Sequence, residues 1–228
     1  MSLSLHNSAL APGPIHPMPM VRLDLVVFRV AANILQVLLA KRQQAPFVGE
    51  MGLPGGVLRI DLDDSLEAAV QRVAQERLGA VLPHVRQVVA VGGAGRDPRA
   101  PWAMTVVYRA VLSDELPLQA GKRVQELLWV DVHQQVSLDE TLAFDHAQLI
   151  RHAIAGLRAE VQALQFAPGF MSREFTLPQL QARSEAVLGV PLNKVTFRRR
   201  VEEAGILREV PGKMIGGAHR PAQVWEFA

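Results

Sequence analysis

Residues 73, 76 and 77 share one face of a helix that the sequence predicts after a glycine pair, and such a face could support phosphoryl chemistry. Carboxylates at spacing i, i+3 and i+4 lie together and could hold divalent cations. Magnesium bound there would neutralise charge on a transferring phosphoryl group. Only Glu76 is acidic, because the other two positions hold Val73 and Arg77. Valine supplies no ligand and arginine adds positive charge, so we expect neither a metal cluster nor catalysis.

The stretch from residue 55 to residue 80 resembles a Nudix box, whose family pattern is G-x5-E-x7-R-E-U-x-E-E-x-G-U with U aliphatic. Anchored on Gly79, the pattern places Arg72 on the family arginine and Glu76 on the first glutamate of the final pair. Asp64 lies near the leading glutamate, two residues further from the glycine pair than the family spacing. The aliphatic and cationic residues named above replace the remaining two glutamates. A capped amphipathic helix after a glycine turn is the purely structural alternative.

Four short strings extend the resemblance beyond the box: PFVGEMGLPGG at 46–56, RDPR at 96–99, FDH at 144–146 and RPAQ at 220–223. No one of them is specific alone, but their order along the chain is. Together they resemble the NrtR family, Nudix-related transcriptional regulators of NAD metabolism, over about residues 22–228. Members of that family also carry eroded Nudix boxes.

The resemblance implies a homodimeric repressor of NAD biosynthesis or salvage genes. Its Nudix-like domain would bind ADP-ribose or a related NAD-derived nucleotide as effector, with no cofactor, and the ligand state would control operator affinity. A dimer reads two half-sites, so the double-stranded DNA operator should be roughly palindromic.

The candidate ligand residues lie at glycines and predicted turns. Adjacent glycines let backbone N–H groups approach a diphosphate without Cβ obstruction, and nearby arginines could cradle its phosphates. The alternative for Arg96 and Arg99 is that they pair with Asp97 or other acidic neighbours. His146 has an alternative role as a structural hydrogen-bonding group. The candidate set is Gly55, Gly56, Arg59, Arg96, Arg99, Phe144 and His146.

The elements that must position these residues form an α/β/α sandwich of Nudix type with a mixed sheet. Asp64 or Ser65 can cap the box helix and Gly79 can end it, because glycine tolerates the left-handed conformation. Hydrophobic periodicity predicts strands at 23–30, 34–41, 86–92, 103–112 and 126–131, and helices at 65–78 and 145–163.

A second domain follows a predicted linker at 165–172. Thr176 and Gln179 fit a capping box for a helix that ends at Gly189, and Asn193 can cap another helix that ends at Gly205. Strands at 206–210 and 222–227 complete a winged helix-turn-helix. We therefore expect an α+β chain divided into a disordered tail at 1–20, a Nudix-like domain at 21–164, the linker and a winged helix at 173–228.

The predicted second helix and wing carry most of the local positive charge. Net charge is only +2, but residues 191–220 hold seven basic residues against three acidic ones. The alternative is a merely solvated face. Arginines 198–200 span about 300° of helix surface at ~100° each, so they cannot all face DNA, while Phe197 and Val201 should face the core. The DNA-binding candidates are Lys194, Thr196, Arg198, Arg199, Lys213, His219 and Arg220.

Composition excludes several classes of protein. The chain contains no cysteine, so disulfides and thiolate metal sites are excluded, and we expect a cytoplasmic protein. No apolar run reaches the ~20 residues of a membrane span, and the seven histidines lack a zinc-binding spacing. Two further hypotheses stay open: an active Nudix pyrophosphatase with an accessory winged helix, and a nucleotide-binding scaffold without DNA affinity.

Overall fold

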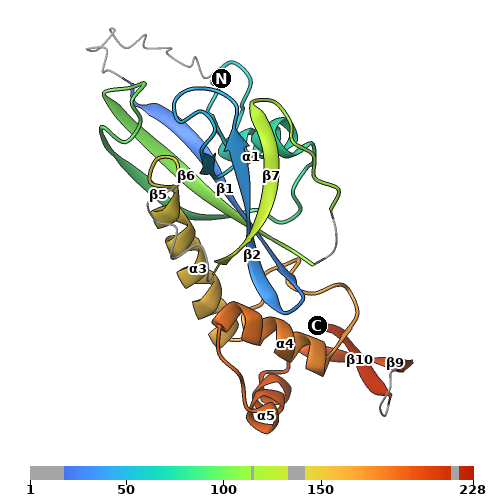
Figure 1. The fold of residues 1–228 in the computed structure, drawn as a ribbon. Helices are drawn as coiled ribbons and strands as arrows, with labels where there is room; N and C mark the ends of the chain where they lie inside the picture. Colours follow the sequence, from blue (N-terminus) through green and yellow to red (C-terminus); the bar gives the residue numbers. More distant parts are fainter. Residues whose placement is uncertain (1–17, 114–115, 133–141, 217–220) are drawn as a thin grey trace, which may run out of the picture.

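The computed structural model describes residues 18–113, 116–132, 142–216 and 221–228. The chain forms a seven-stranded sheet, followed towards the C-terminus by a group of helices and a smaller three-stranded sheet (Figure 1). The large sheet contains β1 (Met20–Ala31), β2 (Ile34–Arg42), β3 (Met51–Gly52), β4 (Gly55–Val57), β5 (Arg86–Ala94), β6 (Trp102–Leu112) and β7 (Val124–Asp131).

Strand β1 lies at the centre of this sheet, and its pairing makes the sheet mixed. It runs parallel to β6 and antiparallel to β2 and β4. The strands predicted at 23–30 and 34–41 form the β1–β2 hairpin, with Ala32 and Asn33 both at positive φ as a tight two-residue turn requires. β3 and β4 were not predicted, because segments of two and three residues carry no readable alternation.

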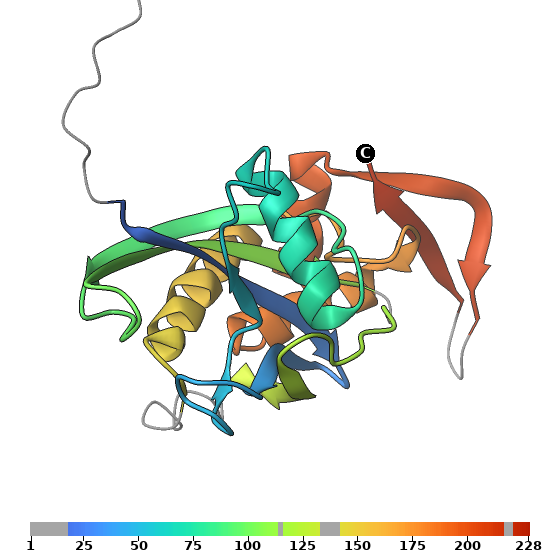
Figure 2. The ribbon, with the colours of Figure 1, turned by 90° about the horizontal axis from the view of Figure 1, so that it is seen from above.

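Helices cover both faces of the large sheet (Figure 2). Helix α1 (Leu66–Leu78) packs its apolar side on one face, around buried Val70 and Val73. Helix α3 (His146–Gln162) covers the other face with residues such as Leu149 and Leu157. The predicted caps of α1 are confirmed: Ser65 accepts from a backbone N–H, and Gly79 is left-handed. The Nudix-type sandwich follows from these two cores.

The C-terminal part has winged-helix order: β8 (Phe175–Thr176), α4 (Leu177–Leu188), α5 (Lys194–Ala204), β9 (Leu207–Ile215) and β10 (Ala222–Phe227). The predicted capping box on α4 is confirmed, because Thr176 and Gln179 each accept from the other's backbone N–H. The strand predicted at 206–210 was too short, because β9 extends to Ile215. Met214 and Ile215 still pair with β10, so the strand continues through residues interpreted as loop.

The segment predicted as a linker packs into the core. Phe170 is fully buried and belongs to the hydrophobic cluster that joins the large sheet, α3 and the C-terminal helices. Its ring lies 5.0 Å from that of Phe166, which in turn lies 5.5 Å from Phe227. The two parts of the chain therefore share one continuous apolar interior.

At the N-terminus, residues 1–17 of the predicted tail lie outside the described residues, and β1 already begins at Met20, within the range assigned to that tail. In the part of the chain that the structure describes, no helix combines the length and the apolar character needed to cross a membrane.

Candidate functional site

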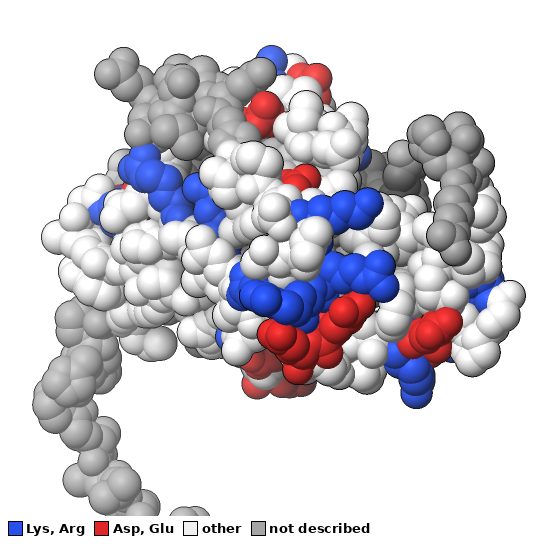
Figure 3. Space-filling model, turned by 90° about the horizontal axis from the view of Figure 1, so that it is seen from below, with Lys and Arg blue, Asp and Glu red and all other residues white. Residues whose placement is uncertain are grey.

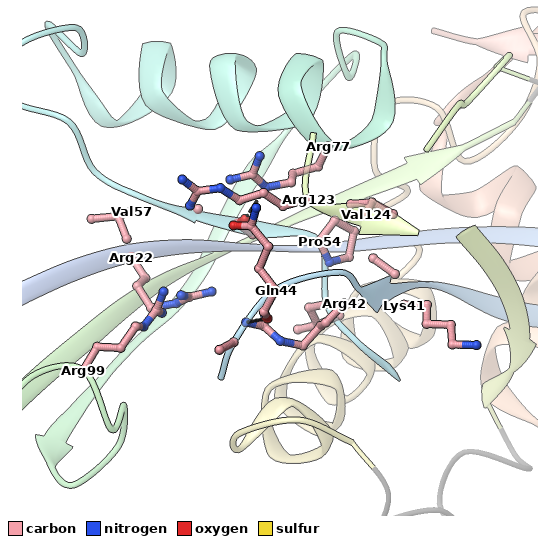
Figure 4. A pocket seen from close by; sticks show the side chains of 15 residues that line it. Arg22, Lys41, Arg42, Gln44, Pro54, Val57, Arg77, Arg99, Arg123 and Val124 are labelled. Carbon is pink, nitrogen blue, oxygen red and sulfur yellow. Dashed lines mark hydrogen bonds between the residues drawn. The ribbon is translucent and has the colours of Figure 1, made fainter. Parts of the chain in front are cut away.

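A cationic cavity that is open to solvent lies beside the glycine pair of β4. Figure 4 shows Arg77 and Arg123 on the side of α1, Arg22 and Arg99 across from them, and Gln44 reaching between the two groups. Lys41 and Arg42 complete the basic lining, and the lining residues include no Asp or Glu among those described. Such a cavity suits an anionic ligand.

The two glycines that line the cavity allow tight packing beneath it. A Cβ on Gly55 would collide with the carboxylate of Asp24, and a Cβ on Gly56 would lie only 2.8 Å from a methyl group of Val73. At both positions the backbone packs against buried groups more closely than a residue with a side chain would allow. This supports the predicted role of the pair as a surface for close backbone approach.

Buried ion pairs hold the arginines across the cavity. The Arg22 guanidinium lies 3.3 Å from Asp24 and 3.6 Å from Asp97, and Arg99 donates two hydrogen bonds to Asp97. Burial alone would raise the pKa of Asp97, but hydrogen bonds from Arg99 and its charge outweigh burial and lower it. Asp97 therefore stays ionised and fixes both cations.

Arg42 shows that the cavity has excess positive charge. Burial, together with the charges of Arg22 and Arg99, lowers the pKa of Arg42 to about 10. Its guanidinium donates to the carbonyl oxygens of Pro46 and Gln44. Arg42 remains protonated at neutral pH, and an anion in the cavity would relieve the repulsion.

Phe144 supports the cations from below rather than lining the cavity. The guanidinium carbons of Arg22 and Arg42 lie 5.1 and 4.9 Å from its ring centre. Phe47 meets the same ring edge-on at 4.7 Å. Phe47, Arg123 and Phe144 all have positive φ although none is glycine. Left-handed backbone at three positions around one cavity is the kind of local strain that clusters at binding sites.

His146 acts as a buried hydrogen-bond acceptor. Its Nδ1 accepts from the backbone N–H of Leu53 at 2.8 Å, and its Nε2 lies 3.8 Å from Asp24. Burial lowers the pKa of His146 to about 4, outweighing the opposite effect of the Asp24 charge. The imidazole is therefore neutral at pH 7, with its proton on Nε2. This geometry is the structural alternative expected for His146.

The Nudix fold implies a divalent cation held by carboxylates of α1, and the residues present do not fit one. Val73 is fully buried against Gly56. Arg77 donates from Nε to the Gly55 carbonyl at 2.8 Å and from Nη1 to the Lys122 carbonyl at 3.0 Å. Glu76, the remaining carboxylate, lies 3.3 Å from Arg77 and 3.4 Å from Arg72, which occupies the arginine position of the Nudix box. Its oxygens are already occupied by guanidinium groups.

Two of the candidate arginines lie away from the cavity lining. Arg59 is on the surface, where its guanidinium pairs with Asp61 at 2.5 Å. Arg96 forms two hydrogen bonds with Asp145, at 2.8 and 2.7 Å, and so ties the β5–β6 loop to the start of α3. The pairing of Arg96 matches the alternative in which Arg96 and Arg99 bind acidic neighbours. Arg99 both pairs and lines the cavity.

The sequence interpretation missed the cations that come from separate elements: Arg22, Arg42 and Arg123. Arg22 and Asp24 lie two residues apart near the start of a mostly apolar strand, and both are buried. Charged residues on one face of such a strand are costly unless paired, so this alternation was a signal that could have found them. Arg123 carried no comparable signal.

A second basic surface lies on α5, at the end of the molecule far from the cavity. Figure 3 shows Lys and Arg side chains gathered there beside acidic ones. Phe197 and Val201 are buried, as predicted. Lys194, Thr196, Arg198 and Arg199 are all exposed, and exposed Val195 lies among them.

Two of these arginines are paired with acidic residues of the same helix. Arg198 lies 2.8 Å from Glu202 and Arg199 lies 3.7 Å from Glu203, both on the same helix and largely exposed. Such pairs are weak and easily exchanged for phosphate contacts. The third arginine, Arg200, instead donates to the Gln162 carbonyl at the end of α3.

The wing contributes Lys213, which lies exposed on β9 and pairs with Glu174. The other two wing candidates, His219 and Arg220, lie outside the described residues. A helix presenting exposed cations beside a hairpin is the arrangement that winged-helix proteins use to enter the major groove.

Comparison with known proteins agrees with this division of sites. Residues 20–153 match the NUDIX domain family, and residues 169–227 match the NrtR DNA-binding winged helix domain. The chain therefore belongs to the class of proteins in which a Nudix domain is joined to a DNA-binding winged helix.

Full-length relatives define the family. The chain is 36% identical to the ADPR responsive transcriptional repressor NtrR of Acinetobacter baylyi, across 93% of this chain and 84% of that protein. Shewanella oneidensis NrtR in complex with a 27mer DNA superposes with a TM-score of 0.75 at 34% identity, covering 91% of this chain and 93% of that one. Its NUDIX domain in complex with ADP ribose matches with a TM-score of 0.57 at 36% identity, covering 62% and 90% of the two chains. This chain belongs to the NrtR family of transcriptional regulators.

Proposed function

We propose that this protein is a transcriptional repressor that binds ADP-ribose, or a related NAD-derived nucleotide, and changes its DNA affinity in response. The observation that carries the proposal is one chain holding a cavity lined by six cationic side chains at the glycine pair and a separate exposed basic helix. Family membership and the ADP-ribose and DNA complexes of the Shewanella relative support it.

The diphosphate would lie against the backbone of Gly55 and Gly56, between Arg22, Arg99 and Arg123. Backbone N–H groups and guanidinium forks together suit a diphosphate, since arginine binds phosphate oxygens in pairs. Of the ligand residues predicted from sequence, this proposal keeps the two glycines and Arg99 in contact with the ligand.

The operator would be a roughly palindromic site upstream of genes for NAD biosynthesis or salvage, bound by a homodimer in the cytoplasm. Exposed Lys194, Arg198, Arg199 and Lys213 would contact DNA, with Thr196 on the same exposed helix. His219 and Arg220 remain predictions for the wing.

Regulation requires that ADP-ribose bind the DNA-competent and DNA-free conformations with different affinity. A gel-shift titration of the full chain on DNA from its own upstream region tests this. We expect sequence-specific binding whose midpoint moves at least fivefold when saturating ADP-ribose is added, since coupling energies of about 1–3 kcal/mol are typical. An unchanged midpoint would remove the regulatory half of the proposal, and absence of specific binding would remove the DNA half.

The competing function is a Nudix pyrophosphatase with an accessory winged helix. We propose instead that the protein does not turn over ADP-ribose, because Val73 and Arg77 occupy positions where the box needs carboxylates, and Glu76 is held by arginines. Incubation with ADP-ribose and magnesium, followed by chromatography for AMP, separates the two functions. Multiple turnovers by the pure protein would favour the enzyme.

A further inference from the structure

The Arg77 guanidinium interacts with oxygen atoms of the kinds that a divalent metal ion would otherwise bind. Its guanidinium donates to two backbone carbonyls, at Gly55 and Lys122, and lies 3.3 Å from the carboxylate of Glu76. Carbonyl and carboxylate oxygens converging on one cation are the environment that hard divalent ions prefer. In this chain the cation is part of the protein.

One end of the same guanidinium remains available to a ligand. Among the described residues, Nε and Nη1 of Arg77 make hydrogen bonds, whereas Nη2 makes none. Nη2 lies 3.6 Å from the position that a Cβ of Gly56 would occupy, and so lies beside the glycine pair. Arg77 is only 7% exposed yet lines the cavity. Nη2 is therefore the part of this guanidinium that is left for a ligand in the cavity.

We propose that the Arg77 guanidinium takes the place of the Nudix divalent cation, so that the cavity binds the diphosphate of its ligand without metal. This inference rests on the proposed binding of a nucleoside diphosphate in this cavity. A fixed arginine neutralises phosphate charge and supplies donors, but it has no open coordination position for water. The substitution thus converts a metal-dependent site into a metal-independent receptor.

Calorimetric titration of the full chain tests this with two probes, ADP-ribose and inorganic pyrophosphate, each in EDTA and in magnesium. We expect wild-type dissociation constants for ADP-ribose that agree within about twofold between the two buffers. We expect Arg77→Gln to weaken both probes about 10- to 100-fold, since a hydrogen bond from a charged group to a phosphate is lost. Arg59→Gln, an exposed arginine outside the cavity, should leave both unchanged.

Arg77→Lys separates the effect of the positive charge from that of the hydrogen bonds to the Gly55 and Lys122 carbonyls, because lysine keeps the charge but cannot reproduce the bonds of the guanidinium fork. Binding by Arg77→Lys should be several-fold tighter than by Arg77→Gln, with equal melting temperatures for the two variants. Equal loss in both would make Arg77 a purely structural residue and overturn the inference. A wild-type affinity that rises more than tenfold with magnesium would also overturn it, and this measurement needs no variant to fold.

The two probes distinguish this inference from the proposed function. Pyrophosphate binding that depends on Arg77, without ADP-ribose binding, would contradict the proposed ligand and leave the metal-free diphosphate site intact. ADP-ribose binding that ignores both magnesium and Arg77→Gln would support the function and reject the role of Arg77. Failure of both probes to bind would reject both.

Discussion

At the scale of single residues, burial decides the role of each ionisable group around the cavity. Asp24 is fully buried, yet its pKa is lowered, because the charge of Arg22 and the hydrogen bond from Thr105 outweigh desolvation. For His146 the attraction of the Asp24 charge is weaker than the effect of burial, so the imidazole stays neutral. The sequence suggested that His146 contacts the ligand, but in the structure it accepts the Leu53 hydrogen bond and so holds Leu53 against the start of α3.

The buried imidazole predicts a pH dependence of stability. The folded-state pKa of about 4 lies below the ordinary value of 6.5, so the unfolded chain binds a proton first as pH falls. Stability is therefore lost between about pH 6.5 and pH 4, and this group accounts for up to about 3 kcal/mol of the loss. Urea denaturation of wild type and His146→Gln should show a stability difference that shrinks from pH 7 to pH 5.

Exposed His152 on α3 provides the matched control. His152→Gln should follow the wild-type pH profile through the same range. A wild-type advantage over His146→Gln that stayed constant from pH 7 to pH 5 would contradict the buried neutral state of His146.

At the scale of elements, local capping defines where α5 begins and ends, and packing defines which side faces outward. Asn193 accepts from the Thr196 N–H, and Gly205 closes the helix in the left-handed conformation. Phe197 and Val201 anchor the inner face. The exposed cations of α5 are therefore presented on a rigid helix, which suits recognition of a DNA groove better than a loop would.

Charge reversal on this helix should abolish specific DNA binding. Arg198→Glu removes one phosphate or base contact and adds repulsion, so we expect at least a tenfold weaker dissociation constant. Arg198→Lys should bind much more tightly than Arg198→Glu and keep a salt dependence close to that of wild type. Fluorescence anisotropy at several salt concentrations measures both effects.

Arg151→Glu, an exposed position on α3, matches the change in net charge. It should bind DNA nearly as wild type does, and thermal denaturation checks that the variant is folded. Equal losses in Arg151→Glu and Arg198→Glu would mean that only total charge matters, and α5 would not be the recognition helix.

At the scale of the whole molecule, a continuous hydrophobic core joins the parts that carry the two sites. Strand β1 carries Arg22 at the cavity, and near its other end the carbonyl of Val30 accepts from Arg183 of α4 at 3.2 Å. Arg183 also donates to the carbonyls of Phe170 and Ser113. Arg158 of α3 donates to a carbonyl near the end of α4. A single strand thus connects the proposed ligand site to the DNA-binding part.

This continuity predicts one cooperative unfolding transition for the full chain. Phe170→Ala would leave a cavity in the shared core and should cost about 3–5 kcal/mol. It should also separate the transition into two, because Phe170 lies where the two parts meet. Differential scanning calorimetry measures both. Two separate transitions in wild type, or a variant as stable as wild type, would contradict a shared core.

The sequence by itself determined the regular elements, because caps and periodicity act over a few residues. Ser65, Gly79, the Thr176 capping box and Asn193 all lie where predicted. It also determined the family, through the order of short strings. It could not place β3 and β4, because segments of two and three residues carry no readable alternation.

Only the tertiary structure decided which cations share a cavity. Arg22, Arg77 and Arg123 come from a strand, a helix and a loop, so no spacing along the chain relates them. The structure also shows that Arg59 and Arg96, which the sequence favoured as ligand residues, are paired with Asp61 and Asp145 and lie outside the cavity lining. Local signals define elements, whereas a binding site depends on distant residues that only packing brings together.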